Sequence, residues 1–326
     1  LTQIETEPEA NLTYLSPDTL GELLALRQQH PQAQLLAGAT DVGLWITKLQ
    51  KPTPQIIDVT RVAELQRIEH SATHLRIGAA VNLVDAFAAI TAQRPQLKAW
   101  CDRFAGLPIR YSATLGGNIA NGSPIGDSMP LLIALGATVV LASARGERML
   151  PVEALYTGYR QTVLAPDEVV AYIDIPHPTS NEFTRAYKIS KRFEDDISAV
   201  CLAVSLQVYN GHIQSARVGC GGVAAMPVRA IKTEAALAGI TPASGQFNAV
   251  KQVLRAECSP ISDLRASADY RREVLGNLLL RLQHELQDAR VTGLETMASA
   301  MNQLYAVLTP QQKEKLDARF GQEMRM

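Results

Sequence analysis

The chain has 326 residues, 47% of them hydrophobic, and a formal net charge of −1, so it is long enough for two or three domains with a substantial core. The balanced charge gives no general electrostatic reason to expect nucleic acid or an anionic membrane as a partner. No apolar run approaches the ~20 residues of a membrane helix and no signal peptide opens the sequence, so we expect a cytoplasmic protein.

The first 65 residues or so predict a small α/β unit. Ser16 and Pro17 are placed to cap and open a helix. A short strand is predicted at 34–37, ending at Gly38, and the apolar run 56–59 predicts a neighbouring strand.

The middle of the chain alternates predicted strands and helices. Asn82 is placed to cap a helix that begins at Leu83. The other elements expected here are strands at 75–79, 137–142 and 168–175 and a helix near 95–105. Because Pro176 and Pro178 cannot continue a central strand, we place a domain boundary near 178–184.

The last third is built differently. Asn210-Gly211 is a hairpin signal between predicted strands at 198–208 and 212–220. Helices are then expected from Arg229 to Gly239, over 247–257 and near 266–288. The stretch 219–224 formally fits the Rossmann fingerprint, but it follows a hairpin strand and no βαβ unit surrounds it. Close packing of a strand end explains it better.

The segment 114–127 is the most unusual in the chain, because it contains four glycines and two asparagines without an apolar period. Glycine lets backbone N–H groups approach a ligand, and Asn, Ser and Asp supply donors and acceptors. The segment therefore predicts a ligand-binding loop.

A second glycine-bearing loop, 35–43, directly follows a predicted strand. Taken alone, it is more simply a strand-to-helix turn than a phosphate cradle. The two loops together favour the cradle, because a dinucleotide pyrophosphate can be held between them.

The four cysteines contain no C-x-x-C pair and the six histidines show no metal-ligand spacing. We therefore expect no metal or iron–sulfur site within this chain, and reduced thiols. No histidine pairs with a nucleophile, so hydrolase chemistry has no support. The pair Tyr159-Arg160 precedes a predicted strand and is either surface packing or a contact for a planar anion.

Several of these segments together resemble one family, the FAD-binding part of the molybdenum hydroxylases, and most of all the small FAD subunits of bacterial xanthine dehydrogenase. The segments are 35–43, 104–127, 157–176, 187–200, 217–230 and 259–271. The resemblance covers approximately residues 9–290. It implies an α+β protein with a two-subdomain FAD-binding fold of the vanillyl-alcohol-oxidase/PCMH type at 9–180, with subdomains of about 9–66 and 67–180. A C-terminal flavoprotein domain with a small antiparallel sheet and a helical bundle is expected at 184–290.

The resemblance also implies the cofactor site. The FAD pyrophosphate would be held by Leu36, Ala37, Gly38, Ala39, Thr40, Asp41 and Val42. The rest of the cofactor would be lined by Phe104, Ala105, Thr114, Gly117, Asn118, Asn121 and Asp127, with Val170 and Lys188 near the isoalloxazine. Tyr159 and the Asp195-Asp196 loop would lie beside the nicotinamide position, the loop as a candidate gate, although its mixed charge is more simply that of a solvated segment. No side chain need act as an acid or a base.

The function implied is electron transfer from 2Fe–2S clusters on another domain through FAD to NAD, in a complex whose molybdenum cofactor lies on a further subunit. One alternative is a related hydroxylase subunit that uses quinone or oxygen as the acceptor. Another is a non-catalytic nucleotide-binding or assembly module.

The ends of the chain fall outside this picture. The sequence starts at Leu1, so we expect that a segment preceded it, and family members of this kind carry their clusters upstream. The tail, 291–326, lies beyond the resemblance. Within it, Thr309, Pro310 and Gln312 predict a capped helix start, and a helical extension is expected there.

Overall fold

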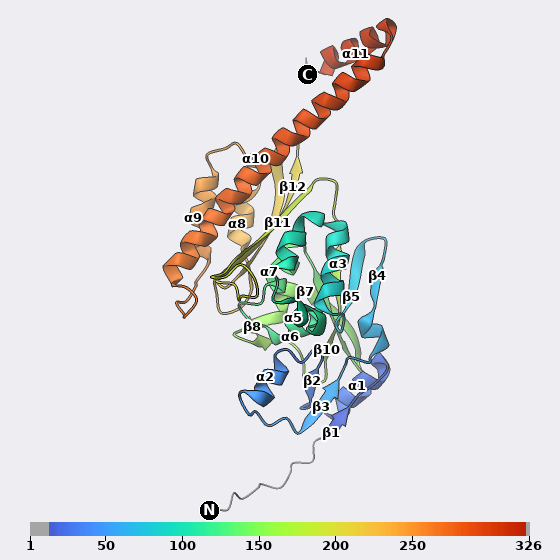
Figure 1. Cartoon of the computed structure of the whole chain (residues 1–326), viewed down its shortest axis with the longest axis vertical. Coiled ribbons are helices and arrows are strands. Elements are labelled where there is room, and N and C mark those ends of the chain that lie inside the picture. Colours follow the sequence, from blue (N-terminus) through green and yellow to red (C-terminus); the bar gives the residue numbers. More distant parts are fainter. Residues whose placement is uncertain (1–12, 324–326) are drawn as a thin grey trace, which may run out of the picture. The chain divides into compact units, whose positions relative to one another are not determined.

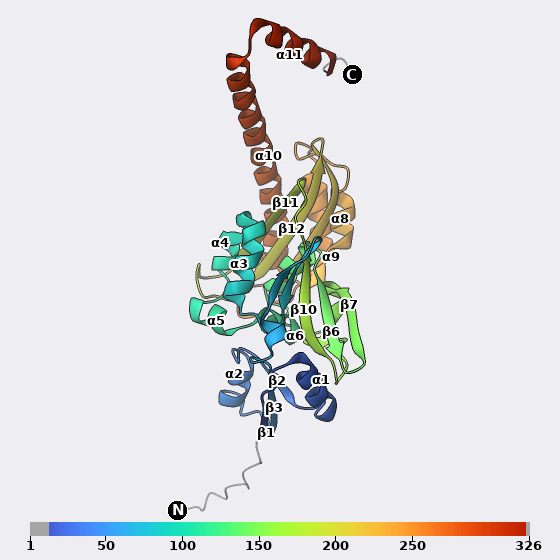
Figure 2. The ribbon, with the colours of Figure 1, turned by 90° about the vertical axis from the view of Figure 1, so that its right-hand side faces the viewer.

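The computed structural model describes residues 13–323, without the side chains of 319–323. Residues 9–12, which the predicted first domain includes, lie outside the described part. The described residues form two compact units, which divide between Leu280 and Arg281. Among the described residues, the first unit contains three larger sheets with helices beside them (Figures 1 and 2) and one two-stranded sheet, formed by Tyr156–Gly158 and Gln161–Thr162.

The first sheet has three parallel strands in the order β1-β3-β2 and is drawn in blue in Figure 2. Its elements are β1 (Thr13–Leu15), α1 (Leu20–Gln29), β2 (Gln34–Leu36), α2 (Val42–Thr47) and β3 (Gln55–Asp58). The predicted α/β unit is thus present, but Ser16 is not the helix cap. Thr19 is, because its side chain accepts a hydrogen bond from the Glu22 amide at 3.2 Å.

The second sheet has five strands in the order β4-β5-β10-β6-β7, and all neighbours are antiparallel. Its strands are β4 (Ile68–His70), β5 (His74–Gly78), β6 (Thr138–Ser143), β7 (Gly146–Pro151) and β10 (Val169–Pro176). The helices and short elements around it are η1 (Ala63–Gln66), α3 (Leu83–Gln93), η2 (Pro95–Leu97), α4 (Lys98–Asp102), α5 (Leu107–Ser112), α6 (Leu115–Asn121), α7 (Ser128–Ala134), η3 (Val152–Leu155), β8 (Tyr156–Gly158) and β9 (Gln161–Thr162). Asn82 caps α3 as predicted, since its side chain accepts from the Asp85 amide at 2.9 Å.

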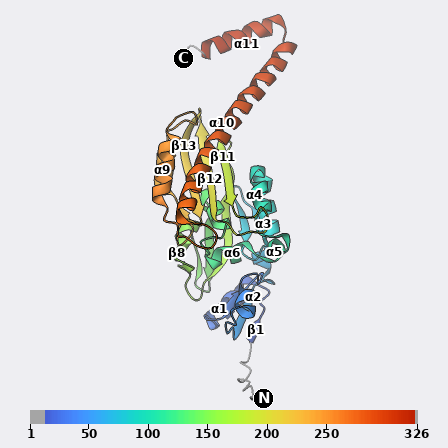
Figure 3. The same ribbon diagram turned by 60° about the vertical axis from the view of Figure 1, so that its left-hand side comes forward.

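The third sheet is antiparallel in the order β11-β12-β13-β14, and α8 packs against β13. Figure 3 shows α9 and the start of α10 (Ala268–Val307) beside this sheet. Its elements are β11 (Glu182–Ile189), β12 (Val200–Tyr209), β13 (His212–Gly221), β14 (Val228–Arg229), α8 (Ile231–Leu237) and α9 (Phe247–Glu257). The predicted hairpin turn is confirmed, with φ of 48° at Asn210 and 77° at Gly211.

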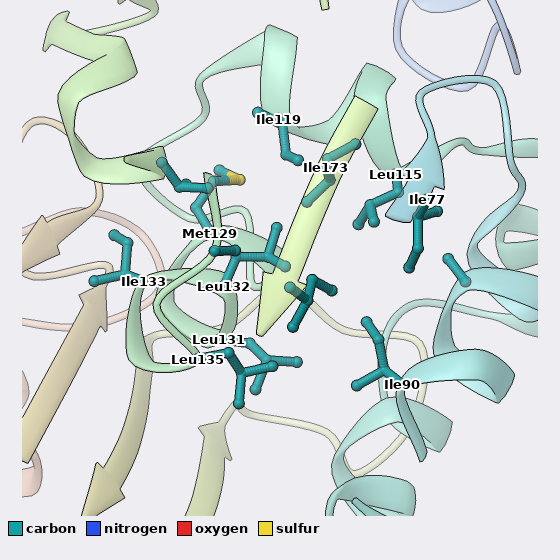
Figure 4. Close-up of a cluster of buried hydrophobic side chains, with 14 of the residues drawn as sticks. Ile77, Ile90, Leu115, Ile119, Met129, Leu131, Leu132, Ile133, Leu135 and Ile173 are labelled. Carbon is teal, nitrogen blue, oxygen red and sulfur yellow. The ribbon is translucent and has the colours of Figure 1, made fainter. Parts of the chain in front are cut away.

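Helix α7 is the centre of the main hydrophobic core. All seven of its residues are buried, and its side chains pack with others from α3, α6, β5 and β10 (Figure 4). Its other side lies against β12 and β13. A Cβ on Gly219 would lie 2.0 Å from the Pro130 carbonyl oxygen, so strand and helix meet backbone to backbone. This confirms that the 219–224 pattern reflects close packing.

The second unit begins inside helix α10 (Ala268–Val307), which runs far past the predicted end near 288. The added stretch contains no proline, so nothing in it stops the helix. A second helix, α11 (Pro310–Glu323), follows. Its predicted cap is confirmed, because the Thr309 amide donates to Gln312 Oε1 at 2.9 Å. Among the described residues, no helix is both long and apolar enough to cross a membrane.

Candidate cofactor-binding site

A cavity of about 440 Å³ lies between the loop that follows β2 and helix α6. Most of the predicted cofactor residues line it: Leu36, Ala37, Gly38, Ala39, Thr40, Asp41, Val42, Thr114, Gly117, Asn118, Asn121 and Val170. The volume is within the ~300–1,000 Å³ that is common for small-molecule sites. The fold therefore brings the two glycine-bearing segments to one recess.

The loop after β2 offers free backbone donors. Among residues 13–323, the amides of Gly38, Ala39 and Thr40 make no hydrogen bond within the protein. Ala39 adopts a φ of 56°, and a Cβ on Gly38 would lie only 1.8 Å from the Ser112 carbonyl oxygen. Gly38 is therefore required for the loop to approach α5, and the consecutive amides can receive an anionic group.

The segment 114–127 is not a loop throughout, which corrects the sequence interpretation. It contains α6, with Thr114 as its N-cap and Gly122 as a left-handed end at φ 59°. The amides of residues 115–118 are all bonded within the protein: to Val81 O, Ala79 O, Thr114 Oγ1 and Thr114 O, respectively. These amides are therefore not free for a ligand, and the polar side chains that α6 presents at the recess are those of Asn118 and Asn121.

Two buried polar atoms on the recess have no hydrogen-bond partner in the part of the chain that the structure describes. They are Arg27 Nε and Asp41 Oδ2. Arg160 approaches Asp41 Oδ2 at 3.9 Å, and burial lowers the pKa of the Arg27 guanidinium. Sequence reasoning missed Arg27, because a basic residue in the last turn of a helix is an ordinary terminal charge.

The remaining predicted cofactor residues form a second group around a buried ion pair. Lys188 Nζ donates to Asp127 Oδ2 at 3.0 Å, and Ser198 Oγ donates to the same oxygen at 2.8 Å. Asp127 Oδ1 is buried without a partner among the described residues. The Lys188 ammonium also lies 6.0 Å from the centre of the Phe104 ring.

This second group is connected to the recess through α6. Ser128, which follows Asp127, donates a hydrogen bond to Asn118 Oδ1. Ala105 has a φ of 50°, and its carbonyl accepts from Arg110 Nη1 at 2.6 Å. Phe104 and Ala105 are thus held in a bent segment beside the ion pair.

The three candidates for the NAD side are not gathered in one place. Tyr159 is 62% exposed and sits in the turn between β8 and β9, next to Arg160. Asp195, at φ 47°, reaches towards Gly106, where an added Cβ would lie 3.1 Å from its carboxylate. The Asp196 carboxylate accepts from the Arg192 amide at 2.8 Å, which lowers its pKa. The Asp195 loop therefore lies beside Phe104 and Ala105, whereas Tyr159 lies on the Asp41 side.

The other sequence features concern metals and thiols. All four cysteines are buried and free. In residues 13–323, no three His, Cys, Asp or Glu side chains gather in a group that could hold a metal ion.

Comparison with known proteins identifies the class. Residues 9–178 match the family described as the FAD binding domain in molybdopterin dehydrogenase, and residues 185–286 match the CO dehydrogenase flavoprotein C-terminal domain. The first match covers more than half of the chain, so the chain belongs to this family and is a FAD-binding component of the molybdenum hydroxylase type.

Individual relatives agree with this assignment. The xanthine dehydrogenase FAD-binding subunit of Escherichia coli O157:H7 is 29% identical over 277 residues, which is 84% of this chain and 95% of that protein. The xanthine dehydrogenase/oxidase of Gallus gallus is 33% identical over 243 residues, 69% of this chain. The chain matches only 18% of the length of that relative.

Solved structures show the same fold. Carbon monoxide dehydrogenase from Hydrogenophaga pseudoflava superposes with a TM-score of 0.78 at 30% identity, over 83% of this chain and 95% of that chain. Quinoline 2-oxidoreductase from Pseudomonas putida 86 gives a TM-score of 0.78 at 24% identity, over 85% and 98% of the two chains. The predicted family resemblance and the α+β fold class are both confirmed.

Proposed function

We propose that this chain is the FAD-binding electron-transfer component of a xanthine dehydrogenase-like complex, in which electrons from 2Fe–2S clusters on another domain pass through bound FAD to NAD. The names of the relatives support this assignment, as does the recess between the 36–42 loop and α6. The partners proposed are a 2Fe–2S domain or segment and a molybdenum-cofactor subunit, in the cytoplasm.

The residues present fit FAD, and one observation carries this conclusion. At the recess lie the amides of Gly38, Ala39 and Thr40 and a buried guanidinium nitrogen of Arg27, none of which has a hydrogen-bond partner within residues 13–323. Such a donor set suits the oxygens of a pyrophosphate. Bound FAD would supply reversible one- and two-electron chemistry.

The chain's own part is to bind and orient the cofactor. The 36–42 loop, Asn118 and Asn121 would hold its polar portion at the recess. Phe104, Ala105 and Lys188 would border the ring system, with the Lys188 charge fixed by Asp127. A fixed ammonium near the ring favours additional negative charge on it.

We also propose the domain division 9–180, 184–290 and a tail at 291–326. The two family matches, at 9–178 and 185–286, support the first two parts. The tail lies beyond both matches, and we propose that it takes no part in the cofactor site.

The first experiment is a visible spectrum of the purified protein. FAD binding predicts absorption bands near ~370 and ~450 nm, which are those of an oxidised flavin cofactor. Absence of these bands after reconstitution with FAD would show instead a nucleotide-binding or assembly module that carries no flavin.

The second experiment is anaerobic stopped-flow mixing of the FAD-loaded protein with NADH. Bleaching of the band near ~450 nm is expected, because hydride transfer between nicotinamide and flavin is reversible. No bleaching at millimolar NADH would contradict NAD as the partner and favour quinone or oxygen.

A further inference from the structure

The second half of α10, which lies beyond both family matches, carries an exposed apolar row. We call this row the seam, and its residues follow one another at spacings of four, three, four and three: Gly293, Met297, Ala300, Leu304 and Val307. Such spacing places them on one side of a helix, as in the heptads of a coiled coil. All are exposed, and the exposed fraction is 59% at Met297, 45% at Leu304 and 78% at Val307.

The seam continues a row that is buried nearer the start of α10. Leu275, Leu279, Leu282 and Leu286 follow the same spacing, and each is at most 5% exposed. Ala289 connects the two rows. One face of α10 is therefore apolar along nearly its whole length, and its second half is exposed in the described part of the chain.

Helix α11 contacts a different side of α10. The Tyr305 hydroxyl donates to Asp317 Oδ2 at 3.0 Å, and Lys313 Nζ lies 5.0 Å from the centre of the Tyr305 ring. Tyr305 lies about 100° around the helix from the seam residue Leu304. The seam, about 21 Å long at ~1.5 Å per residue, therefore stays open beside α11.

The charge near the seam limits what can cover it. Between residues 291 and 309, Glu295 is the only charged residue, and it lies about 160° around the helix from Met297. Helices that bind anionic membranes and surfaces that bind nucleic acid are rich in lysine and arginine. The seam therefore fits the uncharged apolar face of another helix.

The seam is complementary to itself when two copies of α10 pack antiparallel. Gly293 then faces Leu304 of the second copy, and Met297 faces Ala300 of the second copy, because the two facing residue numbers have a constant sum. Each large side chain meets a small one, which fills the space between the helices. Parallel packing would instead place glycine against glycine and alanine against alanine, and would leave voids.

The edges of the seam favour the same orientation. Thr296 and Gln303 flank it on one edge, and Leu294 and Met301 flank it on the other. Antiparallel helices bring like edges together, so that polar residues face polar ones and apolar residues face apolar ones. Parallel helices would set the polar edge of each copy against the apolar edge of the other.

We propose that the seam binds a second copy of this chain, through an antiparallel pair of α10 helices centred between Ala298 and Ser299. This inference goes beyond the proposed function, because the contact needs neither FAD nor NAD, and it joins two flavin-binding components. Since the contact is short, the dimer is reversible and forms in the micromolar concentration range.

Sedimentation equilibrium of the full-length, FAD-loaded protein tests the dimer. Leu304→Glu places an unpaired charge on the seam and should raise the dissociation constant at least about tenfold. The matched control is Asn302→Glu, which adds the same charge at an exposed position on the opposite side of α10 and should leave the constant unchanged. Equal constants in the two variants, or a wild type that is monomeric at submillimolar concentration, would overturn the proposal. Binding of that monomer to phosphatidylcholine vesicles would assign the seam to a lipid surface instead.

Cysteine crosslinking tests the orientation without adding charge to the seam. Because Met297 and Ala300 face each other across the antiparallel pair, an oxidised equal mixture of Met297→Cys and Ala300→Cys chains should form linked dimers faster than either variant alone. The four native cysteines are buried, so they do not compete for this disulfide. Faster crosslinking of either variant alone than of the mixture would show parallel packing and overturn the antiparallel pair.

Discussion

Lys188 and Asp127 form an ion pair at 3.0 Å in which their side chains are only 4% and 6% exposed. The pair joins β11, in the C-terminal part of the chain, to the start of α7, in the FAD-binding part. Since a buried charge is stable only with its partner, the pair fixes these two parts relative to each other at the proposed ring site.

Replacing Lys188 with Met should lower the free energy of unfolding by about 3 kcal/mol, because the Asp127 carboxylate would stay buried without its counter-ion. Urea denaturation of the FAD-free protein measures this. The control is Lys98→Met. The Lys98 and Asp102 side chains are 68% and 58% exposed, so loss of their ion pair should lower the free energy of unfolding by less than ~0.5 kcal/mol. An equal decrease in the free energy of unfolding in the two variants would show that the buried ion pair stabilises the fold no more than the exposed one.

Gly38→Ala should abolish or strongly reduce FAD content. The new methyl group would lie 1.8 Å from the Ser112 carbonyl, which forces the loop with its free amides away from α5. Gly43→Ala is the matched control five residues on, since no atom of another element in the described part of the chain lies within 4 Å of its Cβ position. The measurement is flavin absorbance per protein. Equal flavin content in both variants would show that Gly38 is not needed for FAD binding.

How much the sequence predicts is clearest for local signals. The Asn82 cap and the Asn210-Gly211 turn were predicted correctly, because their geometry depends on a few neighbouring residues. Helix α6 was not, since its glycines suggested a loop. The structure shows why: a Cβ on Gly116 would lie 2.4 Å from the Ala79 side chain. That constraint comes from a distant part of the chain.

The same distinction holds for the site. The two glycine-bearing segments could be identified from their composition and their family resemblance, and the fold brings them to one recess. Arg27 could not, because its exposure to the recess depends on how α1 packs. The separation of Tyr159 from Asp195 could not be predicted from the sequence either, because the two residues lie in connections within different sheets.

Glu168 should make stability depend on pH. Two hydrogen bonds from Arg148, at 2.6 and 2.7 Å, lower the pKa of its carboxyl. A carboxyl whose folded pKa is lowered contributes stability above its unfolded pKa, and this contribution is lost as the pH falls through the folded value. Glu168→Gln should therefore cost about 1 kcal/mol at pH 7, a modest figure because Arg148 is 47% exposed.

Urea denaturation at several pH values checks this expectation. The difference between the wild type and Glu168→Gln should shrink below pH ~4, where the carboxyl protonates in the unfolded chain. Glu147→Gln, an exposed glutamate on the neighbouring β7, serves as the control. A pH-independent difference for Glu168→Gln would mean that shape rather than charge matters at this position.

Removing residues 291–326 should leave FAD content unchanged. Every residue that lines the recess lies between Leu23 and Val170, and the C-terminal family match ends at 286. Flavin absorbance of the shortened protein measures this directly. Loss of FAD from a shortened protein whose urea denaturation midpoint, measured without FAD, equals that of the full chain would assign the tail to the cofactor site.

The backbone contact between Gly219 and Pro130 has a consequence for protein engineering. The two residues belong to different family matches, yet they touch with no side chain to absorb a change in spacing. A chimera that exchanges the C-terminal part between relatives must therefore keep glycine at position 219. It must also keep the backbone path of α7 around Pro130. Evolution faces the same condition, so the two halves of this flavoprotein are expected to be inherited as a matched pair.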